Sequence, residues 1–532
     1  MRKLIPCLFW WVAFAAEATD PYPRNQAIDI QHYLFQIELN DRDDVIEGHA
    51  SITIQFKQTI PQLLLDLVAQ SDGTGMEVRS VGVDGQDRNF RHHIDILTID
   101  LPPIRPGDIK VVTVDYQGIP RDGLIIGKNK YGDRTFFGDN WPNRARHWLP
   151  TIDHPYDKAQ VDFVVTAPDR YQVVSNGEQI EESNLLGNRK LTHWRERIPI
   201  PTKLMVIGVA PFAVQKSGEV DGKPVTTWVY RQDRNAGFTD FAIAPSVLQY
   251  FDDAIGPFAY EKLANVQSKT RFGGMENASC IFYFENAVTG RNERESLIAH
   301  EIAHQWFGDS VTENDWYHVW LSEGFATYFT NVYLEKKYGV DRLRQELSAQ
   351  REKVVAFAKE RFAPVIDTTL MDINRVLSTN TYQKAGWVLH MLRRELGDEV
   401  FFEGIRSYYA KFKNGNALTE DFRRVMEIAS GRDLRPFFDQ WLRHPGHPVL
   451  SGRWRFDPRS GSVQVQIKQE QSRVFRFPIE LEIAGADGRA VSKVVMVESK
   501  SVNASIPLDF EPLTLTLDPG VNLLFEGQLM GK

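Results

Sequence analysis

Two histidines four residues apart, with further glutamates placed around them, have the types and spacing of a metal-dependent hydrolytic site. His300 and His304 would lie on one face of a helix, because an α-helix turns about 100° per residue. Both imidazoles could therefore reach one ion. Glu323 follows nineteen residues after His304 and is the natural third ligand. Three protein ligands and an open fourth position for water are typical of catalytic zinc sites, so we predict one Zn²⁺ per chain.

Glu301 directly follows the first histidine of this motif. It is too close along the chain to bind the same ion comfortably beside both histidines, but it would point near the open position. We therefore expect Glu301 to take a proton from the attacking water as a general base.

The same His-Glu-x-x-His spacing also arises by chance on amphipathic helices, where it has only a structural role. Here the surrounding residues Ile302, Ala303, Trp306 and Phe307 are apolar and predict a buried helix. Buried histidines and glutamates need a partner that offsets their lost hydration, and a metal ion is such a partner. The flanking residues therefore favour the metal site.

Composition limits the possible classes of protein. A chain of 532 residues is long enough for about three domains. Its 42% hydrophobic and 25% charged residues are ordinary for a soluble globular protein. The net charge is −8, and no cluster of Lys and Arg is interleaved with aromatics, so we expect no nucleic-acid partner.

The first 18 residues have the features of a secretory signal peptide. Arg2 and Lys3 precede an apolar run over residues 4–16, with small-residue cleavage sites at 13–15 and 16–18. The run is too short to span a bilayer, so we expect no integral membrane segment after cleavage. We predict an exported protein, periplasmic or secreted. Cleavage would remove Cys7 and leave Cys280 alone, which rules out an intramolecular disulfide in the mature chain.

Alternation with a period of two marks the region after this leader. Residues 33–39, 50–56 and 111–116 alternate apolar and polar side chains between Gly, Asp and Pro, which is typical of antiparallel sheet. We predict an N-terminal β-sheet domain over residues 19–212.

Helical periodicity replaces this alternation in the middle of the chain, over segments such as 321–338 and 381–396. We predict a zinc catalytic domain over residues 213–446. After a linker rich in Pro, His and Gly, alternation returns, which predicts a C-terminal β-sandwich domain over residues 447–532.

A second motif lies upstream of the histidines, at Gly273-Gly274-Met275-Glu276-Asn277. Together with His-Glu-x-x-His and Glu323, which follows after eighteen intervening residues, it resembles the M1 family of zinc aminopeptidases, of the gluzincin type. The similarity continues through residues 382–384 and 433–441. It implies a multidomain α+β protein with a thermolysin-like, mostly helical catalytic domain, of the bacterial exported type that lacks a C-terminal helical domain.

The resemblance also implies roles for single residues. His300, His304 and Glu323 would bind zinc, and Glu301 would act as general base. Tyr382 would donate a hydrogen bond to the oxyanion. The substrate-binding residues would be Gly273, Gly274, Met275, Glu276 and Asn277, with Glu276 holding the free α-amino group of the substrate. The substrates would then be peptides with a free N-terminus.

The chain departs from the family pattern at several positions. Thr330 stands where many members have an acidic residue near the substrate amine, so amine binding is expected to rest on Glu276. Residues 137–146 lack the glutamine that many members direct to the first subsite, and Asp139 or Asn140 is the candidate replacement. Lys384 is followed by Ala rather than Gly. Without a helical cap, the site is expected to be open to longer peptides.

Two other functions remain open. One is a different zinc hydrolase on the same scaffold, an endopeptidase or an epoxide hydrolase, although the Gly-Gly-Met-Glu-Asn motif favours recognition of a free amine. The other is a noncatalytic peptide-binding protein with a vestigial site, although the ligands, the base and Tyr382 are all present. The first-residue preference and the oligomeric state are left open. The remaining histidines are expected to be structural or solvent-facing: His147, His154, His318, His390, His444 and His447.

Overall fold

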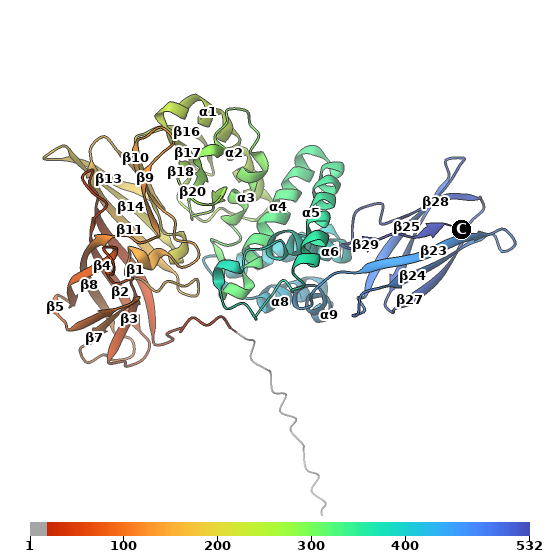
Figure 1. Ribbon diagram of the computed structural model, residues 1–532, viewed down its shortest axis with the longest axis horizontal. Coiled ribbons are helices and arrows are strands. Elements are labelled where there is room, and N and C mark those ends of the chain that lie inside the picture. The colour runs from red at the N-terminus through yellow and green to blue at the C-terminus, as the bar shows by residue number, and fades with distance from the viewer. Residues whose placement is uncertain (1–18, 532) are drawn as a thin grey trace, which may run out of the picture.

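The computed structural model describes residues 19–531, and the predicted leader lies outside this range. Figure 1 shows a β-rich region at one end, a mostly helical region in the middle and a second β-rich region at the other end. The predicted multidomain α+β fold is confirmed. Within residues 19–531, no helix combines the length and the apolar character needed to cross a bilayer.

An eight-stranded sheet dominates the N-terminal region, in the order β13-β14-β11-β1-β2-β8-β4-β5. Its alternating residues bury one face, as Tyr33, Phe35 and Ile37 do on β1. The strands are β1 (Ile28–Glu38), β2 (Ile46–Phe56), β4 (Gly75–Val83), β5 (Gln86–Asp87), β8 (Ile109–Ile119), β11 (Ala159–Pro168), β13 (Glu178–Leu185) and β14 (Arg189–Ile200).

The sheet is antiparallel, as predicted, except at one pair, because β1 and β11 run parallel. Alternation reports which face of a strand is buried and carries no information on strand direction. Two smaller antiparallel sheets complete the region, in the orders β12-β15-β10-β9 and β3-β7-β6. Their strands are β3 (Gln62–Asp66), β6 (Phe90–His93), β7 (Ile96–Asp100), β9 (Leu124–Lys128), β10 (Arg134–Gly138), β12 (Gln172–Ser175) and β15 (Ile207–Ala210).

The central region begins with a mixed five-stranded sheet, in the order β16-β17-β18-β20-β19. The expectation of helical structure from residue 213 onward is wrong for these five strands, although two helices, Arg234–Asp240 and Ala244–Ile255, lie between β17 and β18. The strand β18 is buried at every position, so it shows no alternation that could identify it. The strands are β16 (Phe212–Val220), β17 (Lys223–Tyr230), β18 (Leu263–Ser268), β19 (Gly274–Met275) and β20 (Cys280–Phe284).

Helices form the remainder of the central region, as predicted for its later part. The helices α3 and α4 pack against each other, and α4 also contacts α5 and α6. The elements are α1 (Arg234–Asp240), α2 (Ala244–Ile255), α3 (Glu295–His304), α4 (Trp320–Tyr338), α5 (Val340–Glu360), α6 (Ala385–Leu396), α7 (Asp398–Phe412), α8 (Thr419–Ser430), α9 (Arg435–Phe438) and the short parallel strands β21 (Val311–Glu313) and β22 (Gly415–Ala417).

Two sheets make up the C-terminal region, as the returning alternation predicts. Buried residues such as Val465 on β24 and Leu481 on β25 form its core. The strands are β23 (Val449–Asp457), β24 (Ser462–Gln469), β25 (Phe477–Gly485), β26 (Ala490–Val497), β27 (Ser501–Pro507), β28 (Pro512–Leu517), β29 (Glu526–Gly527) and β30 (Met530–Gly531).

Candidate active site

The helices α3 and α4 bring the three predicted metal ligands together. The Nε2 atoms of His300 and His304 are 3.1 Å apart. Oε2 of Glu323, in the first turn of α4, lies 3.5 Å from Nε2 of His300 and 3.3 Å from Nε2 of His304. Ligand atoms about 2.1 Å from a tetrahedral ion are about 3.4 Å from each other. The three edges of this triangle therefore match the zinc geometry.

The ring of His304 is oriented from its far side. Nδ1 of His304 lies 3.0 Å from the carbonyl oxygen of Phe307 and 3.1 Å from Oγ of Ser322. A carbonyl only accepts, so Nδ1 carries the proton and the lone pair of Nε2 is directed at the ligand triangle. Gly308 makes room for this arrangement, since a Cβ there would lie 2.2 Å from Oγ of Ser322 and its φ is +118°.

The donor set suits a divalent cation. Oε2 of Glu323 is buried, faces the Nε2 atoms of both histidines and has no further hydrogen-bond partner among residues 19–531. Burial alone would raise the pKa of Glu323, but His304 and His300 hold it below its usual range. An ionised carboxylate whose buried oxygen faces two imidazole nitrogens has the composition and charge of a catalytic zinc site.

Glu301 is buried next to this triangle and close to Gly274 of β19. A Cβ built on Gly274 would lie 2.2 Å from Oε1 of Glu301, so only glycine leaves room for the carboxylate. Burial raises the pKa of Glu301 well above its usual range, and the negative charges of Glu276 and Glu323 add to this effect. A carboxylate made more basic in this way is suited to accept a proton from water.

The contact between Gly274 and Glu301 gives a first prediction. Changing Gly274 to Ala forces Glu301 out of its position, and we expect kcat to fall by about tenfold to a hundredfold, because a displaced general base transfers protons poorly. The matched control is Gly127→Ala on β9, outside the cavity lining, where a new Cβ meets no heavy atom within 4 Å in the described part of the chain. Equal kcat values for the two variants would contradict the role of this contact.

Glu276 is held in place by a residue that the sequence did not single out. Nε2 of Gln305 donates to the carbonyl of Glu276 over 2.7 Å, and Oε1 of Gln305 accepts from the amide of Ser279 over 2.8 Å. Gln305 directly follows His304. The end of the helix that carries the metal ligands therefore also positions, through Gln305, the segment that carries Glu276. The carboxylate of Glu276 lies within 4.8 Å of ligand atoms of Glu301 and His304.

These groups line a single cavity of about 240 Å³. It brings together all of the predicted site residues except Asn277, which is completely buried and is not part of the lining. The lining residues are Trp141, Phe272, Gly273, Gly274, Met275, Glu276, Leu297, His300, Glu301, His304, Glu323, Leu377 and Tyr382.

Tyr382 enters this cavity from a π-helical turn, Asn380–Lys384, that precedes α6. Its ring stacks on His300, with ring centroids 6.1 Å apart and an interplanar angle of 22°. Burial, with the nearby charge of Glu323, raises the pKa of Tyr382 well above its usual range. The hydroxyl is therefore protonated at neutral pH and can donate a hydrogen bond.

The expected replacement for the missing glutamine is wrong. The Asp139 carboxylate accepts from the amide of Arg271 and pairs with Arg144, and the Asn140 amide donates to the carbonyl of Thr202. Both polar side chains are therefore bound to other groups of the protein. The next residue, Trp141, lines the cavity instead. Its ring contacts that of Phe272 edge to face, with centroids 5.7 Å apart.

The cavity combines a polar end with an apolar wall. The metal ligands, Glu301, Glu276 and Tyr382 form the polar end, whereas the wall consists of Trp141, Phe272, Met275, Leu297 and Leu377. Thr330 is not part of the lining, and its hydroxyl donates back to the carbonyl of Ala326 over 2.7 Å. Glu276 is therefore the acidic residue of the cavity that is neither a ligand nor the candidate base.

Comparison with known proteins agrees with this architecture. Residues 30–204 match the Peptidase M1 N-terminal domain, and residues 240–441 match the Peptidase family M1 domain. Probable aminopeptidase 2 of Sulfurisphaera tokodaii is 25% identical over 520 residues, which is 92% of this chain and 63% of that protein. Human glutamyl aminopeptidase is 28% identical over 350 residues, which is 61% of this chain and 37% of that protein.

Solved structures show the same fold. A crystal structure of an M1 zinc metallopeptidase from Deinococcus radiodurans superposes with a TM-score of 0.68 at 22% identity, covering 78% of this chain and 93% of that one. This chain spans less than two thirds of the length of the two curated relatives described above. The two domain matches cover both the β-rich N-terminal region and the helical region that holds the candidate site, and the chain belongs to peptidase family M1.

Proposed function

We propose that this chain is a zinc-dependent aminopeptidase that removes single residues from peptides with a free N-terminus. The observation that carries the proposal is the placement of Glu276. Its carboxylate lies within 4.8 Å of Glu301 and His304, beside the ligand triangle. A peptide whose α-ammonium pairs with Glu276 would have its first peptide bond next to Glu301, because only one substrate residue lies between the α-ammonium and that bond.

Zinc held by His300, His304 and Glu323 would polarise the first carbonyl and acidify the attacking water. Glu301 accepts the proton of that water and returns it to the leaving amine. Tyr382 donates a hydrogen bond to the oxyanion that develops on the carbonyl. Glu276 fixes the register by pairing with the α-ammonium of the substrate, so cleavage occurs after the first residue.

The apolar wall supports a preference for large apolar first residues. An aromatic or long aliphatic side chain would bury its surface against Trp141, Phe272 and Met275. The Deinococcus radiodurans metallopeptidase has been crystallised with a Tyr-Ser-Ala substrate, whose first side chain is also aromatic. The edge strand β19 has one strand partner, β20, and its outer edge could pair with the substrate backbone.

The test is hydrolysis of aminoacyl-amide fluorogenic substrates, each beside its N-acetylated twin, with and without a zinc chelator. We expect chelator-sensitive cleavage that is far faster for the free-amine series than for the acetylated twins, fastest for aromatic and long aliphatic first residues, and restored by added Zn²⁺. Equal cleavage of the two series would instead identify an endopeptidase. Absence of cleavage by zinc-loaded protein would favour an epoxide hydrolase or a noncatalytic peptide-binding protein.

We further propose that the protein is exported after removal of residues 1–18, on the basis of the charged and apolar segments of the leader. The intact mass of the protein recovered from a periplasmic or culture-medium fraction tests this. A mature chain that begins at Thr19 is the expected result, and a full-length chain found only in the cytoplasm would contradict export.

A further inference from the structure

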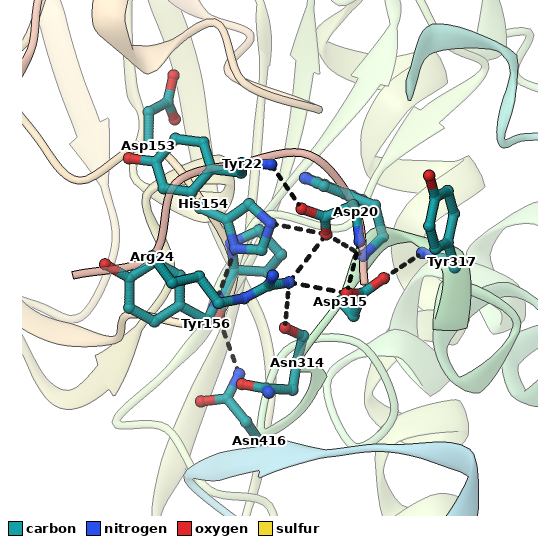
Figure 2. A network of polar contacts seen from close by, with 12 residues as sticks. Asp20, Tyr22, Arg24, Asp153, His154, Tyr156, Asn314, Asp315, Tyr317 and Asn416 are labelled. Carbon is teal, nitrogen blue, oxygen red and sulfur yellow. Dashed lines mark hydrogen bonds and ion pairs between the residues drawn. The ribbon is translucent and has the colours of Figure 1, made fainter. Parts of the chain in front are cut away.

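A short N-terminal segment, residues 20–24, joins the N-terminal β region to the loop that precedes α4 (Figure 2). We call it the N-terminal strap. The Asp20 carboxylate is 5% exposed, and it accepts hydrogen bonds from the ring Nε2 of His154 over 2.9 Å and from the amide of Trp316 over 3.0 Å. One side chain therefore contacts both regions.

Further contacts hold the strap on the loop. The amide of Asp20 donates to Oδ2 of Asp315 over 3.0 Å. The guanidinium of Arg24 lies 3.0 Å from Asp20 and 2.8 Å from Asp315, and it also donates to the carbonyl of Asn314. Asp315 in turn accepts from the amide of Tyr317, which fixes the start of the helical turn before α4. The strap thus determines where residue 316 lies.

Trp316 connects this network to the substrate cavity. Its side chain is 2% exposed and contacts Trp141 edge to face, with ring centroids 5.6 Å apart and an interplanar angle of 81°. Trp141 contacts Phe272 in the same way, and both rings line the cavity. A chain of direct contacts therefore runs from Asp20 through Trp316 to the apolar wall. Tightly packed aromatic rings transmit small displacements, because interiors leave few voids to absorb them.

We propose that Asp20 is a positioning residue for substrate binding, acting through Trp316 on the Trp141 wall of the cavity. The kinetic part of this inference rests on the proposed aminopeptidase function. The metal ligands and Glu301 come from α3 and α4, so the inference predicts an effect on KM and little effect on kcat.

The test is Asp20→Asn with matched controls. Losing the carboxylate removes a charge-assisted hydrogen bond to Trp316, and we expect KM for an aromatic aminoacyl substrate to rise about tenfold, with kcat within about twofold of wild type. Asp162→Asn is the control, because Asp162 is likewise buried and is paired with two histidines and Arg195, but on β11. An equal rise in KM for the control would overturn the proposal.

A double-mutant cycle tests the route through Trp141. If Asp20 acts through this ring, Asp20→Asn should have almost no further effect on KM in a Trp141→Ala background, since coupled residues are not additive. Full additivity would overturn the route. If Asp20→Asn does not fold, Trp316→Phe shrinks the intermediate ring and should raise KM in the same way.

Hydrogen exchange separates this inference from the proposed function. In Asp20→Asn, amides in peptides covering residues 138–149 should exchange faster than in wild type, and in Asp162→Asn they should not. An enzyme inactive on every aminoacyl substrate that still shows this change would reject the function and retain the positioning role. An active enzyme with unchanged exchange over 138–149 would reject the positioning role.

Discussion

Replacing Glu301 by Gln is expected to lower kcat by about a thousandfold while zinc remains bound. Glutamine has nearly the same shape, so it fits beside Gly274, whose Cβ position lies 2.2 Å from Oε1 of Glu301. It cannot accept a proton from water, and general-base catalysis contributes about a hundredfold to ten-thousandfold in such reactions. The ligand triangle of His300, His304 and Glu323 is unchanged. The measurements are kcat on a free-amine substrate and zinc content per chain.

The matched control for this variant lies on the same helix. Glu295→Gln changes the first residue of α3, a glutamate that pairs with Lys337 and is outside the cavity lining. We expect this control to keep wild-type kcat. Retention of more than a tenth of wild-type turnover by Glu301→Gln, in protein with full zinc content, would remove Glu301 from the role of base.

Local spacing explains which parts of the site could be predicted from the sequence. His300, Glu301 and His304 share one helical turn, so their relative placement follows from helix geometry alone. Glu323 could be added because the following helix begins at Trp320, only sixteen residues after the first helix ends at His304. The family resemblance supplied Glu276 and Tyr382, whose place in the cavity depends on packing between distant segments.

Some residues of the site could not be predicted, because the sequence around them contains no pattern that indicates their contacts. Trp141 comes from the N-terminal β region, and a single tryptophan in a loop is indistinguishable from any core aromatic in the sequence. Gln305 looks like one polar residue in an apolar helix until its two backbone partners are known. The backbone amide of Asp20 donates to the carboxylate of Asp315 across 295 positions of the chain, a separation at which periodicity carries no information.

The start of the central region shows the same limit for secondary structure. The strand β18 reads Leu-Ala-Asn-Val-Gln-Ser and is buried on both faces, so polar residues occur inside the sheet. Asn265 and Gln267 are completely buried. Oδ1 of Asn265 accepts from the hydroxyl of Tyr283, and Oε1 of Gln267 accepts from the amide of Tyr230. Buried polar residues of this kind remove the apolar run by which a central parallel strand is usually identified.

Replacing Glu276 by Gln is expected to remove most of the preference for a free N-terminus. The α-ammonium of the substrate would lose its ionic partner in a cavity where Glu276 is only 5% exposed. Breaking a buried charge pair costs about 3–5 kcal/mol, which corresponds to a fall in kcat/KM of between about 150-fold and about 4,000-fold. The fall should appear mainly in KM, because Glu301 and the ligand triangle are intact. Hydrolysis of the N-acetylated twin, which carries no ammonium, should be unchanged.

The comparison between the two substrates decides what Glu276 does. If Glu276 only supports the fold, Glu276→Gln lowers kcat/KM for both substrates equally. The control Glu285→Gln should then have the same effect, because Glu285 is an equally buried glutamate that pairs with Lys269 outside the cavity. If Glu276 binds the amine, the free-amine substrate alone loses rate, and the ratio of its kcat/KM to that of its twin collapses. Position 330 is a threonine outside the lining, so Glu276 is the acidic residue of the cavity lining that is left to bind the amine. This ratio therefore measures the contribution of a single carboxylate.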